Sequence, residues 1–207
     1  NASFEKAMEL DPGRGLFGAA QLALAFGRLE RAFALARRAA ELDSLSASAQ
    51  MLLALAAFYA GRLDEAVQLF QKTIQLSPER ANLHSLLAQV YLAQSLPERA
   101  LAVVGEEKDS FFRLPTLAMI FHALGRTGES DEAIAKIIED YSEAGALQVA
   151  QVYAFRGEAG NAFEWLEIAY SQRDGGLYLT KADPYIGRLK SDPRYAAFLK
   201  KMHLPLN

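Results

Sequence analysis

The sequence has no cysteine, so its 207 residues can form neither a disulfide nor a thiolate metal site. It has only three histidines, His84, His122 and His203, and they are too far apart to show the spacing of a metal site. The formal net charge of −3 indicates no basic surface of the kind that binds nucleic acid. The longest apolar run, Met51 to Ala60, is far shorter than the roughly 20 residues that cross a bilayer. We therefore expect no metal, no nucleic-acid partner and no membrane contact.

Catalytic patterns are also missing. There is no Ser-His-Asp arrangement or nucleophile elbow, and the acid pair Asp64-Glu65 is explained by the preference of negative charge for a helix N-terminus. Residues Gly13 to Gly18 spell G-x-G-x-x-G, but a dinucleotide site needs a preceding strand and a βαβ unit, which the pattern does not indicate. We interpret this segment as a turn between repeats. The sequence thus predicts no catalytic residue, no enzyme and no cofactor.

What is present is helical periodicity in a chain with 51% hydrophobic and 23% charged residues, which is typical of a well-buried globular protein. Residues 47–80 predict two antiparallel helices that are separated at Gly61, a residue suited to a helix end. Small residues, Ala54 and Ala66, fall where the two helices would cross. Pro78 suits the first turn of the helix that follows. This 34-residue unit resembles a tetratricopeptide (TPR) repeat.

The same pattern recurs along the chain, and Gly27 lies 34 residues before Gly61, which sets the register. We place the turn of the fourth unit at Gly128 and that of the fifth at Gly157. The resemblance implies an all-α fold, a right-handed TPR solenoid of antiparallel helix pairs with a C-terminal helical cap. The predicted units are an opening half-repeat at 3–12, helix pairs at about 15–44, 47–80, 81–113, 114–142 and 143–171, and a cap with two short helices at 172–207.

The cap is expected to cover the last repeat, because a solenoid otherwise leaves an apolar end exposed. Asp183-Pro184 and Asp192-Pro193 should each open a short helix. The apolar side chains expected to pack on the last repeat are Tyr185, Ile186, Leu189, Tyr195, Phe198 and Leu199.

Motifs in residues 80–207 carry a narrower resemblance. They include His122-Ala-Leu-Gly-Arg126, Ala162-Phe-Glu-Trp-Leu-Glu-Ile-Ala-Tyr170 and Leu189-Lys-Ser-Asp-Pro-Arg-Tyr195. These segments are similar to C-terminal TPR regions of bacterial multidomain proteins, where such arrays follow adenylate cyclase, serine/threonine kinase or winged-helix and TolB-like regulator modules. Because the chain starts without Met and in mid-repeat, we expect it to be a piece of such a longer protein.

The concave surface is the expected binding site, because first helices line the inner groove of TPR arrays. The residues carried over to this face are Phe17, Gln21, Met51, Leu55, Phe58, Tyr59, Ser85, Gln89, His122, Arg126, Gln151 and Phe155. Met51, Phe58 and Tyr59 form the expected anchor, because Met adapts to irregular surfaces and aromatic residues dominate binding hot spots. The alternative is that several of them only pack against neighbouring helices. The Lys, Asn and Arg clamp of chaperone-binding TPR domains is missing.

These observations favour a non-enzymatic interaction module that binds a peptide or partner helix in an apolar groove. The alternative function is a structural or self-association element, with a homodimer as its consequence, that positions upstream catalytic or DNA-binding domains. We expect a cytoplasmic location, or a periplasmic one if the parent protein has an upstream membrane helix.

Overall fold

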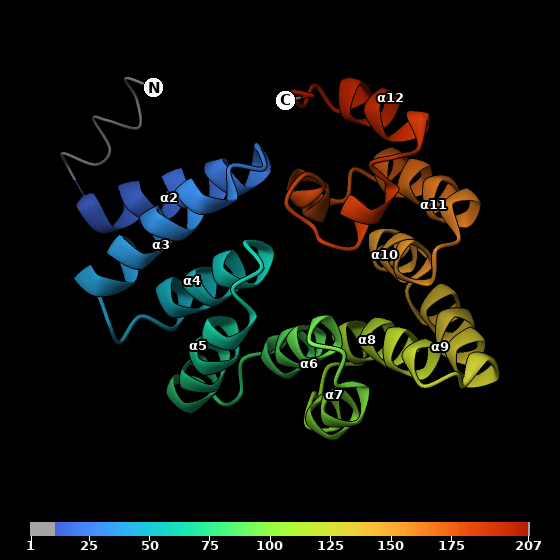
Figure 1. Ribbon diagram of the computed structural model, residues 1–207, viewed down its shortest axis with the longest axis horizontal. Helices are drawn as coiled ribbons and strands as arrows, with labels where there is room; N and C mark the ends of the chain where they lie inside the picture. Colours follow the sequence, from blue (N-terminus) through green and yellow to red (C-terminus); the bar gives the residue numbers. More distant parts are fainter. Residues whose placement is uncertain (1–10, 207) are drawn as a thin grey trace.

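The computed structural model describes residues 11–206, and the part of the chain that it describes has helices and no strands. Ten helices form five consecutive antiparallel pairs, so the predicted all-α solenoid is confirmed (Figure 1). The pairs are α2 (Pro12–Ala25) with α3 (Leu29–Leu42), α4 (Ala47–Tyr59) with α5 (Leu63–Leu76), α6 (Leu83–Ala93) with α7 (Pro97–Val104), α8 (Ser110–Ala123) with α9 (Thr127–Asp140), and α10 (Ala146–Arg156) with α11 (Ala159–Ser171).

Each pair turns at one residue in the left-handed backbone conformation, which glycine adopts without strain. These residues are Gly27, Gly61, Ser95, Gly125 and Gly157, with φ between 61° and 79°. The prediction of Gly128 as the fourth turn is wrong, because Gly128 lies inside α9 and Gly125 makes the turn. In the third pair Ser95 takes the position that glycine has in the others. The turn keeps its hydrogen bond there, because Leu96 N donates to Tyr91 O at 2.9 Å.

The G-x-G-x-x-G segment is helical, so its interpretation as a turn is wrong. The Asp11 side chain accepts a hydrogen bond from Arg14 N at 3.1 Å, and Pro12 is the first residue of α2. An Asp cap followed by Pro starts a helix directly, which places Gly13 to Gly18 in its first turns. The opening half-repeat predicted at 3–12 lies almost entirely outside the described residues.

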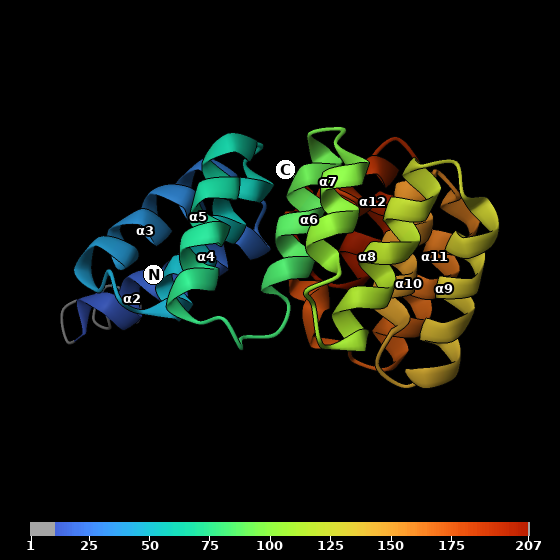
Figure 2. The same cartoon turned by 90° about the horizontal axis from the view of Figure 1, so that it is seen from below.

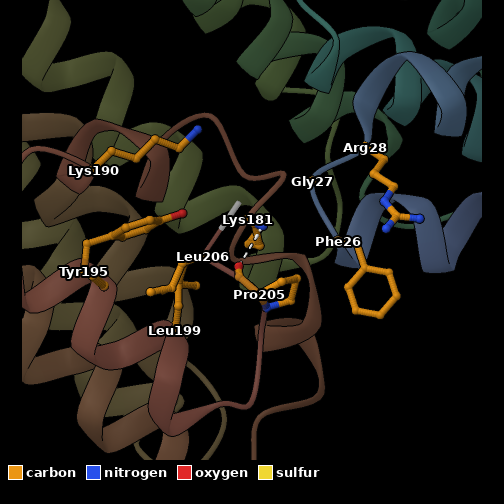
Figure 3. Close-up of a pocket in the computed structure, with 10 residues that line it drawn as sticks. Phe26, Gly27, Arg28, Lys181, Lys190, Tyr195, Leu199, Pro205 and Leu206 are labelled. Carbon is orange, nitrogen blue, oxygen red and sulfur yellow. Dashed lines mark hydrogen bonds between the residues drawn. The ribbon is translucent and has the colours of Figure 1, made fainter.

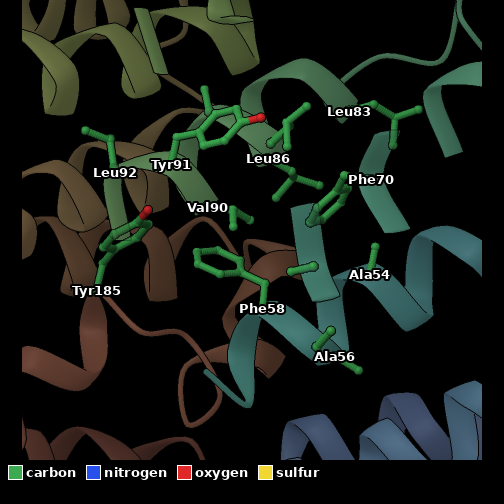
Figure 4. Close-up of a cluster of buried hydrophobic side chains, with 14 of the residues drawn as sticks. Ala54, Ala56, Phe58, Phe70, Leu83, Leu86, Val90, Tyr91, Leu92 and Tyr185 are labelled. Carbon is green, nitrogen blue, oxygen red and sulfur yellow. The ribbon is translucent and has the colours of Figure 1, made fainter. Parts of the chain in front are cut away.

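The buried apolar residues form two clusters, one running from α2 to α10 and one among α10, α11 and the C-terminal segment. Ala54, Ala66 and Phe70 are fully buried in the same cluster, and Figure 4 shows Ala54 and Phe70. Alanine lets two helices approach closely, and the larger ring fills the space next to the crossing. This arrangement explains why the second pair has small residues at the two crossing positions.

The chain does not stop at the last pair but turns back into the curve of the array (Figures 1 and 2). We call residues 172–192 the strap; it contains the short 3-10 helices η1 (Gly175–Leu179) and η2 (Ile186–Leu189) and leads into α12 (Pro193–Lys201). Asp192 caps α12 by accepting a hydrogen bond from Arg194 N at 2.9 Å. Five of the six expected cap residues pack with α10 and α11: Ile186, Leu189, Tyr195, Phe198 and Leu199.

Candidate functional site

The concave face of the array is occupied by the strap. The sixth cap residue, Tyr185, is only 4% exposed and joins the large core cluster instead of the cluster under α12. Its ring meets the edge of Phe155 in α10 at 5.6 Å between centroids. It also meets Phe58 in α4, at 6.5 Å between centroids, and Figure 4 shows these two rings. Its hydroxyl lies 3.5 Å from the backbone oxygen of Gln89 in α6. One side chain therefore connects three helix pairs across the groove.

The neighbouring carboxylate fixes the strap on α10. Asp183 is buried; it accepts hydrogen bonds from Tyr185 N at 2.7 Å, Ile186 N at 3.0 Å and Gln151 Nε2 at 2.6 Å. Burial raises the pKa of Asp183, although these hydrogen bonds oppose the shift. Burial, together with the nearby Asp183 charge, also holds the pKa of Tyr59 well above its usual value.

The strap backbone approaches the groove wall closely at Gly176. A Cβ atom placed there would lie 2.6 Å from Leu147 Cδ2, so a larger residue would require the Leu147 side chain or the strap to shift. Asp174 Oδ1 accepts a hydrogen bond from Gly176 N at 2.7 Å and starts η1. The absence of a side chain at Gly176 thus allows the strap to enter the groove.

A cavity of about 300 Å³ remains in the groove beside the strap. Five of the residues predicted to bind a peptide line it: Met51, Leu55, Tyr59, Gln89 and Gln151. The strap adds Tyr178, Leu179 and Asp183 to its wall. Gln148 also lines it, and its side-chain oxygen is buried without a hydrogen-bond partner among the described residues. The cavity therefore combines apolar side chains with amide groups.

The other seven predicted residues lie elsewhere. Phe58 and Phe155 pack against Tyr185 of the strap. The His122 ring lies 6.0 Å from the Phe155 ring between centroids. Burial lowers the pKa of His122, and the charge of Arg156 lowers it further. Ser85 is fully buried in α6. Arg126 occupies the N-cap position of α9 without a capping hydrogen bond from its side chain, which pairs with Glu129 and stacks on Phe121. Phe17 is partly buried against the core, and Gln21 is partly exposed on α2; neither lines the cavity.

Sequence reasoning misses the strap residues that enter the groove. Asp183 and Tyr185 are expected to serve the cap alone, because Asp-Pro predicts a helix start and the aromatic residue predicts packing on the last repeat. Both signals are local, whereas the path of the strap depends on Phe58 and Gln89, which are about a hundred residues earlier in the chain.

Two further kinds of site are absent from residues 11–206. No group of three or more His, Asp or Glu side chains is placed to hold a metal ion there. No helix in that range combines the length and the apolar character that a membrane crossing requires.

Comparison with protein families finds two tetratricopeptide-repeat models, one over residues 17–81 and one over residues 57–106. Together the matched segments run from within α2 to just beyond α7, so they span the first three helix pairs. None of the curated proteins matches the sequence. The repeat family is therefore supported for the first half of the chain, where the spacing of the turn residues is 34.

Solved structures with the same fold extend over nearly all of the chain. The TPR protein YrrB, described as having an unusual peptide-binding site, is 24% identical, covers 85% of this chain and 95% of its own, and has a TM-score of 0.51. PilW, a type IV pilus biogenesis factor, is 14% identical over 92% of this chain and 93% of its own, with a TM-score of 0.57. A tetratricopeptide repeat protein from Parabacteroides merdae is 15% identical over 98% of this chain and 84% of its own, with a TM-score of 0.58. At these identities the likeness shows the TPR solenoid fold.

Proposed function

We propose that this TPR-type solenoid is a non-enzymatic protein-interaction module of a larger bacterial regulatory protein, and that its groove binds an apolar segment of a partner in extended conformation. TPR proteins are generally interaction modules. The observation that carries the proposal is the cavity beside the strap, where Met51 and Leu55 lie next to amide side chains.

The chemistry of the cavity fits an extended peptide. Apolar walls accept one or two large side chains, and glutamine amides can donate to and accept from peptide groups. The buried oxygen of Gln148 has no partner among the described residues, and a peptide N–H would provide one. A whole helix is about 10 Å wide, so it would have to displace the strap, whereas an extended segment can enter beside it.

The test is selection of peptides from a random display library on the wild-type protein, followed by affinity measurements on variants. Leu55→Ala removes a side chain from the cavity wall and should weaken the selected peptides about tenfold or more, as at interface hot spots. Leu45→Ala is the matched control, because Leu45 is 78% exposed and outside the cavity. Peptides that bind both variants as tightly as wild type, or a failure to select any peptide, would contradict the proposal.

Self-association is the second candidate function, and exposed leucines favour it. Leu42 near the end of α3, Leu45 after it and Leu76 at the equivalent end of α5 are all exposed. Sedimentation over a range of protein concentrations should then detect a dimer that Leu45→Glu disrupts. A monomer at every concentration would rule out this function.

A further inference from the structure

A second, larger pocket lies where the two ends of the array meet. The turn between α2 and α3 faces the strap and α12, and a Cβ atom at Gly27 would lie 3.3 Å from the side chain of Lys181. The pocket between them has a volume of about 800 Å³ (Figure 3). Phe26 and Arg28 line it from the first turn, and Lys190 and Tyr195 line it from the other end of the array. We call it the seam pocket.

Its charges are all of one sign. Arg28, Lys181 and Lys190 line the seam pocket, and none of the described Asp and Glu residues does. Arg28 lies over the ring of Phe26 at 5.6 Å, and among the described residues neither it nor Lys190 has an ion-pair partner. Burial lowers the pKa of Lys181, and the charges of Lys190 and Arg28 lower it further. Positive charge is thus concentrated in a protein whose net charge is negative.

A buried hydroxyl group points into the same space. Tyr195 is 6% exposed, and its hydroxyl has no hydrogen-bond partner among residues 11–206. Figure 3 shows this hydroxyl directed between Lys190 and Lys181. Buried polar groups in folded proteins nearly always have a partner, so an unpartnered hydroxyl at a pocket wall is a candidate hydrogen-bond donor to a bound molecule.

We propose that the seam pocket binds a small organic anion that carries phosphate or carboxylate groups. Arg28 would present a planar fork to the oxyanion, the Lys190 ammonium group would add a point charge, and the Tyr195 hydroxyl would donate a hydrogen bond, while Lys181 Nζ donates to Pro205 O at 2.8 Å within the pocket wall. Leu199 and Leu206, which also line the pocket, would contact the apolar body of the molecule. The volume lies within the usual range of about 300–1,000 Å³ for small-molecule sites.

Such a ligand would join the two ends of the array. Arg28 belongs to the first helix pair, whereas Lys190 and Tyr195 belong to the strap and α12, so one bound anion contacts both. A ligand that binds only the folded, closed form stabilises it by mass action. The site is separate from the peptide cavity, so either proposal can fail without the other.

The test uses sodium pyrophosphate and sodium citrate as probes, measured by calorimetry in low-salt buffer against sodium chloride of matched ionic strength. Wild type should bind at least one probe saturably with a dissociation constant below about 1 mM. Binding of pyrophosphate alone would identify a phosphate ligand, binding of citrate alone a carboxylate ligand, and binding of both a general oxyanion site. Binding of neither would overturn the proposal.

Variants then separate the seam pocket from general charge attraction. Arg28→Gln and Lys190→Gln should each weaken binding about tenfold, and Tyr195→Phe should weaken it several-fold while circular dichroism stays unchanged. Lys72→Gln is the matched control, because Lys72 is an exposed cation on α5, away from the pocket. An equal loss in Lys72→Gln, or undiminished binding in both Arg28→Gln and Lys190→Gln, would also overturn the proposal.

Discussion

The outer surface of the array and the strap connect the repeats in different ways. On the outside, exposed ion pairs join consecutive pairs: Arg62 with Glu30 at 2.8 Å, Arg37 with Glu65 at 2.7 Å and Lys108 with Glu79 at 2.8 Å. On the inside, Tyr185 reaches α4, α6 and α10 at once, and its hydrogen bond to Gln89 spans 96 residues of sequence. The first set of contacts is exposed to water and local, whereas the second is buried and long-range.

The difference between these two sets of contacts bears on whether the repeats of the array unfold together or separately. Repeats that contact only their neighbours behave almost as a one-dimensional chain, in which an end can unfold while the rest remains folded. Exposed ion pairs change little in this respect, because water and salt screen them. A buried side chain shared by three pairs links their stabilities, so the strap should make the array unfold in a single step.

The largest expected effect comes from Tyr185→Ala, which removes the inner connection and leaves the outer ion pairs intact. Deleting a large buried aromatic side chain should lower the free energy of unfolding by about 3–5 kcal/mol. Urea unfolding followed by circular dichroism should also become broader or biphasic, because the first pairs no longer unfold with the last.

Tyr178→Ala is the control for this variant, since Tyr178 belongs to the same strap but is 41% exposed. It should change stability little. If both variants unfold with the same midpoint and a single sharp transition, the strap does not couple the repeats.

The sequence predicts features that are determined within one helix pair, but it does not predict contacts between distant parts of the chain. The crossing alanines and Gly27, Gly61 and Gly157 are predictable, because each position is specified by residues within one helix pair. The turn at Gly125 is missed because Gly128 nearby offers the same residue type, and only hydrogen bonding distinguishes them. The path of the strap and the seam pocket require contacts between opposite ends of the chain, which no periodic pattern encodes.

Ala66→Leu tests the helix crossing inside one pair and should have the next largest effect. Ala66 is fully buried, so added methylene groups must push α4 and α5 apart at a cost of about 1–3 kcal/mol. Ala102→Leu in α7 is the matched control, because position 102 is exposed. Thermal melting compares the two, and an unchanged melting temperature for Ala66→Leu would mean that position 66 is not at a crossing.

The turn positions should respond in opposite directions in successive pairs. Gly61 has φ of 75°, and a Cβ atom placed on it would have no other atom within 4 Å, so Gly61→Ala should cost about 1–2 kcal/mol from backbone strain alone. Ser95 has φ of 61° at the equivalent position, and Ser95→Gly should recover up to about 1 kcal/mol. Urea midpoints measure both changes. A shift of the same sign in the two variants would show that the two turns are not equivalent.

The smallest expected effect is the pH dependence that Asp183 gives to the inner contact. Burial raises the pKa of Asp183 above its usual value near 3.8. At pH values between the usual pKa and the raised one, the folded protein therefore keeps a proton that the unfolded chain has lost. Stability from this group is therefore fully present at acidic pH and decreases as the pH rises through the window. The hydrogen bonds from Gln151 and the strap backbone act against this rise in the pKa.

Asp183→Asn removes the titration but retains an oxygen that can accept from Tyr185 N and Ile186 N. The stability of the variant relative to wild type should therefore increase from about pH 4 to about pH 7, as measured by urea unfolding of both proteins at each pH. Comparing the two proteins cancels the contribution of the many surface carboxylates. If the stability of the variant relative to wild type instead fell with pH, the hydrogen bonds to Asp183 would outweigh burial and lower its pKa. An ionised Asp183 would then stabilise the position of the strap, as charged side chains do on the outer surface.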